Sequence, residues 1–170
     1  MNKKIALLLL AVFLAFSFAQ AQEGGIKMKI SSPEFQNNQL IPKKFTCQGD
    51  DINPALIIRD IPAGAETLAL IMDDPDAPMG TWVHWVVFNI PLITEIQEDS
   101  IPGEQAMNNF GRADYGGPCP PAGTHRYFFK IYALDAQIDP GLVHDKKSLE
   151  KAMQTHILAN AELIGLYKKQ

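Results

Sequence analysis

Cysteine is scarce in this sequence of 170 residues, which contains only Cys47 and Cys119. Neither cysteine belongs to a C-x-x-C motif or stands near an H-x-x-x-H pattern, so the spacing argues against a zinc site. The Asp74–Asp76 spacing fails the EF-hand calcium pattern at its third position. We therefore expect no metal ion and no other cofactor.

Positive charge is also in short supply, with 15 Lys and Arg against 19 Asp and Glu and a formal net charge of −4. Nucleic acids and anionic membrane surfaces are bound through a basic face of a protein. The overall charge balance gives no reason to expect either of them as a partner.

Long apolar runs are absent except at the N-terminus. Residues 2–4 form a basic start, residues 5–18 are almost all apolar, and residues 19–21 (AQA) fit an A-x-A cleavage site. This order is typical of a secretory signal peptide. A membrane anchor is the alternative, but the run is shorter than the roughly 20 residues that span a bilayer, and it holds no Cys for lipid attachment. We expect a signal peptide over residues 1–21 and one mature domain over residues 22–170, periplasmic or secreted.

Export bears on the two cysteines. Outside the cytosol, in an oxidising compartment, two cysteines allow one intramolecular bond. Two separate buried thiols remain the alternative, because a spacing of 72 residues decides nothing by itself. Export favours a Cys47–Cys119 disulfide.

Repeats and low-complexity tracts are lacking, and the chain consists of short apolar runs separated by Pro and Gly. The runs with β-type composition are 27–30, 55–58, 67–72, 82–90 and 125–134. From Lys146 to Tyr167 apolar residues recur every three or four positions, which predicts a C-terminal helix capped by Asp145 or Ser148. The predicted fold is mostly β, with packed antiparallel sheets and this helix covering an edge or a face.

Two segments each join a rigid Pro/Gly loop to a β-type run that carries a histidine. They are residues 73–85 (DDPDAPMGTWVHW) and 115–127 (YGGPCPPAGTHRY). In the first run, strand alternation predicts Trp82, His84 and Val86 on one face, with Val83 and Trp85 on the other.

In the second run the same alternation places His125 and Tyr127 on one face and Arg126 on the other. Asp74 lies where the first strand breaks at a proline, so one pocket could collect Asp74, His84, His125 and Tyr127. Asp76 fits a turn cap as well as a ligand role, because Asx side chains cap turns at proline.

The loop of residues 116–121 (GGPCPP) has a composition suited to anion binding. Glycines let backbone N–H groups converge on an anion, and prolines stiffen the loop without needing donors of their own. A structural turn is the alternative. The adjacent His-Arg-Tyr sequence favours a small phosphate or carboxylate held near two imidazoles.

The string DPDAP followed closely by HW, and then GPCPPAGTHRYFF, resembles the phosphatidylethanolamine-binding protein (PEBP) family. The likeness is greater to its bacterial YbhB/YbcL, or Raf-kinase-inhibitor-like, branch, whose N-P-x-L segment is matched at residues 53–56. The resemblance covers roughly residues 27–167. It implies two antiparallel β-sheets with peripheral helices and a surface pocket for small anions or phospholipid head groups.

The resemblance also implies which residues contact the ligand and how the chain turns before them. A sharp bend at the Ala77–Pro78 peptide favours a cis bond there. By motif position, the expected ligand-binding residues are Asp74, Ala77, Pro78, Trp82, His84, Gly117, Pro120, Pro121, His125 and Tyr127.

Three functions fit these observations. The first is a non-enzymatic binding protein for phosphate or a head group such as phosphoethanolamine. The second is an inhibitor or regulator of another exported protein, as some members of the family are. The third is an Asp/His-dependent hydrolase, although the sequence contains no G-x-S-x-G nucleophile motif. We expect the first.

Overall fold

The computed structural model describes residues 27–169. The predicted signal peptide lies outside these residues, and within them no helix combines the length and the hydropathy that a bilayer crossing needs. The elements in chain order are β1 (Lys29–Ser31), β2 (Gln39–Leu40), η1 (Lys43–Phe45), β3 (Leu56–Arg59), β4 (Thr67–Asp74), β5 (Trp82–Ile90), β6 (Glu95–Ile96), β7 (Glu104–Gln105), β8 (Thr124–Leu134), η2 (Pro140–Leu142), α1 (Lys146–Met153) and β9 (Ile157–Lys168).

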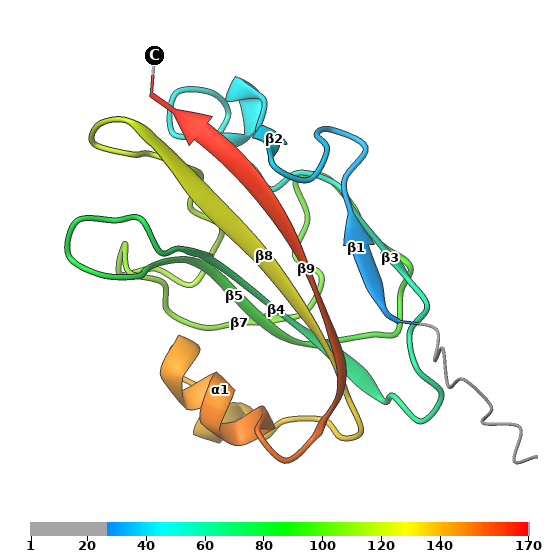
Figure 1. Cartoon of the computed structure of the whole chain (residues 1–170). Coiled ribbons are helices and arrows are strands. Elements are labelled where there is room, and N and C mark those ends of the chain that lie inside the picture. Colours follow the sequence, from blue (N-terminus) through cyan, green and yellow to red (C-terminus); the bar gives the residue numbers. More distant parts are fainter. Residues whose placement is uncertain (1–26, 170) are drawn as a thin grey trace, which may run out of the picture.

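The strands form two sheets, as the sequence predicts. The larger sheet has the order β2-β9-β8-β4-β5-β7 and the smaller one the order β1-β3-β6. Every pairing is antiparallel except the short β2–β9 pairing, which is parallel. In Figure 1 the small sheet lies on one side of the large sheet and α1 lies on the other. The mostly β, two-sheet fold is therefore confirmed.

The central strands of the large sheet are buried on both faces. β4 is buried at all eight of its positions. One face contributes Leu70, Met72 and Phe129 to a core between the two sheets. The other face contributes Ile71 and Phe88 to a second core beneath α1. These two layers hold the β4, β5 and β8 ends, where the candidate site lies, in a fixed arrangement.

The prediction of a helix from Lys146 to Tyr167 is wrong beyond its first two turns. Asp145 caps α1 as expected, in a capping box with Ser148, but the helix ends at Met153. The remaining residues form β9, which pairs with β8 from Thr124 to Leu134. In the last part of β9 the buried positions alternate, and this fits a strand rather than a helix.

Gly165 lies within β9. A Cβ at this position would be 2.4 Å from the Ile41 side chain and 2.9 Å from Phe35. The glycine is needed because the segment of residues 35–41 crosses β9 at close range, and any side chain there would push it away.

Candidate functional site

A cavity of about 350 Å³ opens where β4, β5 and the loop before β8 come together. It lies at the end of the large sheet where β4 finishes and β5 begins. Six of the predicted ligand-binding residues line it, together with three others. The lining consists of Asp74, Ala77, Pro78, Met79, Trp82, His84, Phe110, Cys119 and Pro121.

Asp74 is the only carboxylate in the lining of this candidate pocket, and it is paired with His125, which does not line the cavity. Asp74 Oδ2 lies 2.7 Å from Nδ1 of His125, and both side chains are buried. Asp74 Oδ1 accepts the backbone N–H of Asp76 at 2.8 Å, which closes the turn over Pro75. The carboxylate is therefore fixed from two directions, and it orients the imidazole of His125.

His84 reaches the same space through a β-bulge. Met72 of β4 pairs with Trp85, and Asp73 pairs with Val83, so His84 is the extra residue on β5. A bulge places two consecutive side chains on one face. His84 contacts Tyr127, and Trp85 enters the core between the sheets on that same face.

The bulge corrects the alternation predicted for this strand. Trp82 and His84 do share the pocket face, but Trp85 lies on that face too. Val86 belongs to the core on the opposite face. Simple alternation therefore placed His84 correctly and failed for the two residues after it, because the register changes at His84.

The protonation of His84 is set by burial and by one hydrogen bond. Nδ1 lies 2.6 Å from the carbonyl oxygen of Gly116, so it carries a proton and donates it. Burial lowers the pKa of His84, and this hydrogen bond together with the Asp74 charge opposes the shift only in part. The imidazole is therefore neutral at pH 7, with Nε2 left as an acceptor.

This lowered pKa predicts a stability change in mild acid. The unfolded chain takes up a proton at His84 near pH 6.5, whereas the folded protein resists it until lower pH. Stability should therefore fall as pH decreases below 6.5, by up to ~1.4 kcal/mol per pH unit from this group. Urea unfolding between pH 7 and 5 should show a flatter dependence for His84→Gln. His144→Gln, at an exposed position, should keep the wild-type slope, and equal slopes in all three proteins would contradict the assignment.

Tyr127 is fully buried beside the same residues. Its ring packs edge-on against His84, with the centroids 5.2 Å apart. Its hydroxyl oxygen makes no hydrogen bond of normal geometry among the described residues, although it lies close to the Asp74 carboxylate and the Cys119 backbone. Burial, followed by the nearby Asp74 charge, raises the pKa of Tyr127, so the hydroxyl keeps its proton and can donate it. An unpaired buried hydroxyl is rare in folded proteins.

The loop glycines do not have the role expected from their composition. The N–H of Gly116 donates to the carbonyl oxygen of His84, and the N–H of Gly117 donates to Asp51 Oδ1 at 2.7 Å. Both groups therefore hold the loop against the protein and are not available to an anion. Of the predicted ligand-binding residues, Gly117, Pro120, His125 and Tyr127 do not line the cavity.

Asp76 and the Ala77–Pro78 peptide do not have the ligand role and the cis bond that the sequence left open for them. The Asp76 carboxylate receives the side chain and the backbone N–H of Arg126, on the outer side of β8. The Arg126 hydrogen bond lowers the pKa of Asp76 to about 2. No described peptide bond is cis, so the predicted cis bond at Pro78 is wrong. The Asp74–Asp76 turn bends the chain sufficiently with a trans proline.

Phe110 is a pocket residue that the sequence did not indicate. Its ring contacts Trp82 at 5.5 Å and His84 at 5.3 Å, measured between centroids. Asn109 holds it there by exchanging two hydrogen bonds with the backbone of Val83. A single aromatic residue in a long loop has no periodicity that could have revealed it. Met79 is a second lining residue that the sequence did not indicate; it is 95% exposed and lies at the mouth of the cavity.

The predicted disulfide is confirmed. Cys47 and Cys119 are joined, with their Cα atoms 5.5 Å apart. The backbone N–H of Cys47 also donates to the carbonyl oxygen of Pro118. Because Cys119 lines the cavity, the disulfide attaches one wall of the pocket to the segment after η1.

Comparison with known proteins places this architecture in one family. The family model described as phosphatidylethanolamine-binding protein matches residues 31–168. A UPF0098 protein of Aquifex aeolicus is 46% identical over 92% of this chain and 97% of its own length. A UPF0098 protein of Pyrococcus horikoshii is 45% identical over 94% of this chain and 85% of its own.

Solved structures agree with these sequences. The crystal structure of the PEBP homologue CT736 from Chlamydia trachomatis matches with a TM-score of 0.82 and 40% identity, over 85% of this chain and 99% of that one. Escherichia coli YbcL, described as a member of the mammalian PEBP family, matches with a TM-score of 0.78 and 27% identity, over 85% and 100%. The chain belongs to the phosphatidylethanolamine-binding protein family.

Proposed function

We propose that this protein is an exported, non-enzymatic binding protein for a small zwitterion that carries a phosphate and an ammonium group, such as phosphoethanolamine. The observation that carries the proposal is the buried hydroxyl of Tyr127, which makes no hydrogen bond of normal geometry. Tyr127 does not line the cavity itself, but its ring packs on His84, which does, and its hydroxyl lies near Asp74. A bound phosphate would give this donor a partner.

The charge of the pocket favours a zwitterion over a simple anion. Its lining contains no Lys or Arg, and Asp74 is its only carboxylate. A phosphate alone would have to approach this carboxylate without a fixed cation nearby. An ammonium group on the same ligand could pair with Asp74 and lie against the aromatic rings of Trp82 and Phe110.

The phosphate would lie next to this ammonium group, toward Tyr127 and His84. Tyr127 can donate its hydroxyl proton, and Nε2 of His84 can donate once it is protonated. Because the free His84 is neutral at pH 7, binding of a phosphate there should be accompanied by proton uptake. Affinity should then rise as pH falls toward 6, as expected for an imidazole that must be charged to bind.

A binding role suits the described residues better than hydrolysis. Asp74 and His125 resemble an acid–base pair, but the pocket lining provides no Ser or Thr, and its one Cys is held in the disulfide. The lining therefore lacks the hydroxyl or free thiol nucleophile that many hydrolases activate with an adjacent base. In residues 27–169 no three His, Cys, Asp or Glu side chains are grouped to hold a metal ion.

The Tyr127→Phe variant tests the proposal. It should weaken phosphoethanolamine binding by about tenfold or more, because a hydrogen bond to a charged group is worth roughly 1.5–3 kcal/mol. It should leave the free energy of unfolding equal or slightly higher, because the hydroxyl has no partner to lose. Isothermal titration calorimetry and urea unfolding measure the two quantities.

Tyr132→Phe is the matched control on the same strand, since Tyr132 packs against the opposite core. Its affinity should equal that of the unmodified protein. Phosphate and ethanolamine, titrated separately, should each bind more weakly than the joined molecule. Unchanged binding in Tyr127→Phe, or equal binding of phosphate alone, would refute the zwitterion pocket.

Export is the second part of the proposal, and it is tested separately. The basic start, the apolar run and the AQA site at residues 19–21 support it, and a disulfide suits an oxidising compartment. Expression in a bacterium should give a mature chain that begins near Gln22 in the periplasmic or secreted fraction. Intact-mass analysis of an uncleaved cytoplasmic protein would overturn this part alone.

A further inference from the structure

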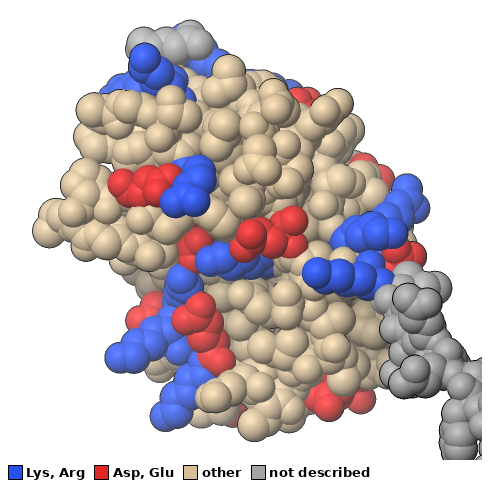
Figure 2. Space-filling view, in the orientation of Figure 1, with Lys and Arg blue, Asp and Glu red and all other residues tan. Residues whose placement is uncertain are grey.

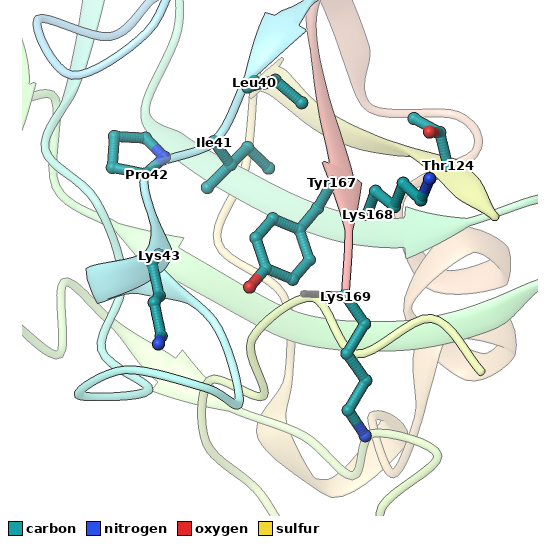
Figure 3. A pocket seen from close by; sticks show the side chains of 8 residues that line it. All are labelled: Leu40, Ile41, Pro42, Lys43, Thr124, Tyr167, Lys168 and Lys169. Carbon is teal, nitrogen blue, oxygen red and sulfur yellow. The ribbon is translucent and has the colours of Figure 1, made fainter. Parts of the chain in front are cut away.

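A second, larger cavity of about 620 Å³ lies next to the end of β9, and the candidate pocket does not include it. Its lining is Leu40, Ile41, Pro42, Lys43, Thr124, Tyr167, Lys168 and Lys169 (Figure 3). We call this cavity the lysine groove.

The sequence explains why the lysine groove opens at this point. β2 pairs with β9 only at Gly165 and Leu166, and the last hydrogen bond of this contact runs from the Ile41 N–H to the carbonyl oxygen of Leu166. Pro42 follows, and it has no N–H to continue the pairing. The chain then turns into η1 while β9 continues alongside β8, and the two segments diverge.

The floor of the groove is apolar. Ile41 and Tyr167 are almost fully buried, and their side chains face the groove together with Pro42 (Figure 3). The Tyr167 hydroxyl donates to Gln48, so mainly the ring is presented to the groove. Leu40 stands at the rim with 64% of its surface exposed. An exposed leucine beside a recessed apolar floor is suited to contact with hydrocarbon.

The rim of the groove is basic. Lys43 extends from one side and Lys169 from the other, while Lys168 points toward Thr124 (Figure 3). Within residues 27–169 none of these three ammonium groups has an ion-pair or hydrogen-bond partner, whereas the neighbouring Lys44 pairs with Glu98. Figure 2 shows basic side chains gathered beside the C-terminal end of the chain, at the top of the view. Three cations are thus gathered around one cavity in a chain whose net charge is −4.

From this arrangement we infer that the lysine groove binds a single-chain anionic amphiphile, with its carboxylate or phosphate between the lysines and its hydrocarbon chain on Ile41, Pro42 and Tyr167. An acidic peptide fits less well, because it needs main-chain partners and Pro42 offers no N–H. A flat bilayer fits less well too, because the apolar floor is recessed. A volume of 620 Å³ is within the range of small-molecule sites.

Titration with dodecanoate below its micelle concentration tests the inference. The unmodified protein should bind dodecanoate and not dodecyltrimethylammonium, which has the same chain and the opposite charge. Lys43→Glu/Lys168→Glu should weaken binding by about tenfold or more, since each substitution replaces an attraction with a repulsion. Leu40→Asn should also weaken it while leaving the charge unchanged. All these positions are exposed, so the variants should fold, which circular dichroism verifies.

Lys147→Glu/Lys151→Glu is the matched control, with the same change of charge on exposed positions of α1. It should alter the affinity for dodecanoate by less than about twofold. Equal loss in this control, equal binding of both amphiphiles, or tighter binding of an oligoglutamate peptide or anionic vesicles would each overturn the inference. His84→Ala should bind dodecanoate normally. If it does not, the amphiphile occupies the candidate pocket and the lysine groove is not the site.

Discussion

Removing the disulfide with Cys47→Ser/Cys119→Ala should lower the free energy of unfolding by roughly 4 kcal/mol. The bond closes a loop of 72 residues, and in the chain-entropy model the loss of this constraint favours the unfolded state by about that amount. Few domains are stable by more than 5–15 kcal/mol, so a large part of the total stability is at stake. Urea unfolding under non-reducing conditions measures the difference.

Reductant provides the control for this prediction. The unmodified protein should move toward the stability of the double variant when the bond is reduced, and the variant should not respond. The Cys119 wall of the pocket should also be less well held, so phosphoethanolamine affinity should drop in the variant. Two unpaired thiols in the mature protein, found by mass analysis, would show that the bond does not form.

Replacing Asp73 should produce the next largest effect, a loss of about 3 kcal/mol for Asp73→Asn. The Asp73 side chain is 1% exposed and lies between Lys130 at 2.8 Å and Lys146 at 2.5 Å. Lys146 begins α1, so the buried carboxylate joins the helix to β4 and β8. Without the Asp73 charge, the ammonium groups of Lys130 and Lys146 repel each other, and no carboxylate between them offsets this repulsion.

Asp76→Asn is the control that shows how much of the Asp73→Asn effect comes from the burial of the Asp73 carboxylate. Asp76 also pairs with a basic residue, Arg126, but the two side chains are 29% and 52% exposed. Exposed ion pairs contribute less than about 1 kcal/mol, because solvent screens them. Thermal or urea unfolding should therefore show a loss several times larger for Asp73→Asn. Similar losses would mean that the Asp73 cluster contributes no more than a surface pair.

The sequence predicted the centre of the fold well and its end poorly. β4, β5 and β8 were visible because buried strands are continuous runs of apolar and β-branched residues. The segment of β9, Ile157–Lys168, has apolar residues at helical spacing, and only its pairing with β8 decides its structure. Such pairing joins residues far apart in the chain, which local spacing does not report.

The candidate pocket shows the same division. Asp74, His84, His125 and Tyr127 come from strands and their ends; Asp74 and His84 line the cavity, and His125 and Tyr127 contact them from outside the lining. Phe110 and the lysine groove depend on loops and on chain segments that meet only in the folded protein. The loop glycines were misread for a similar reason, because Asp51, which takes the N–H of Gly117, is distant in sequence.

The bulge at His84 separates the pocket from the core along a single strand. Before it, Trp82 faces the cavity, and after it Trp85 and Val87 pack between the sheets. Residues 79–81, which join β4 to β5 at the mouth, could therefore be lengthened or shortened without moving a core side chain. The same change placed beyond the bulge would turn every following residue to the wrong face. Met79, the member of this segment that lines the cavity, is thus a position where the mouth of the pocket can be changed at little risk to folding.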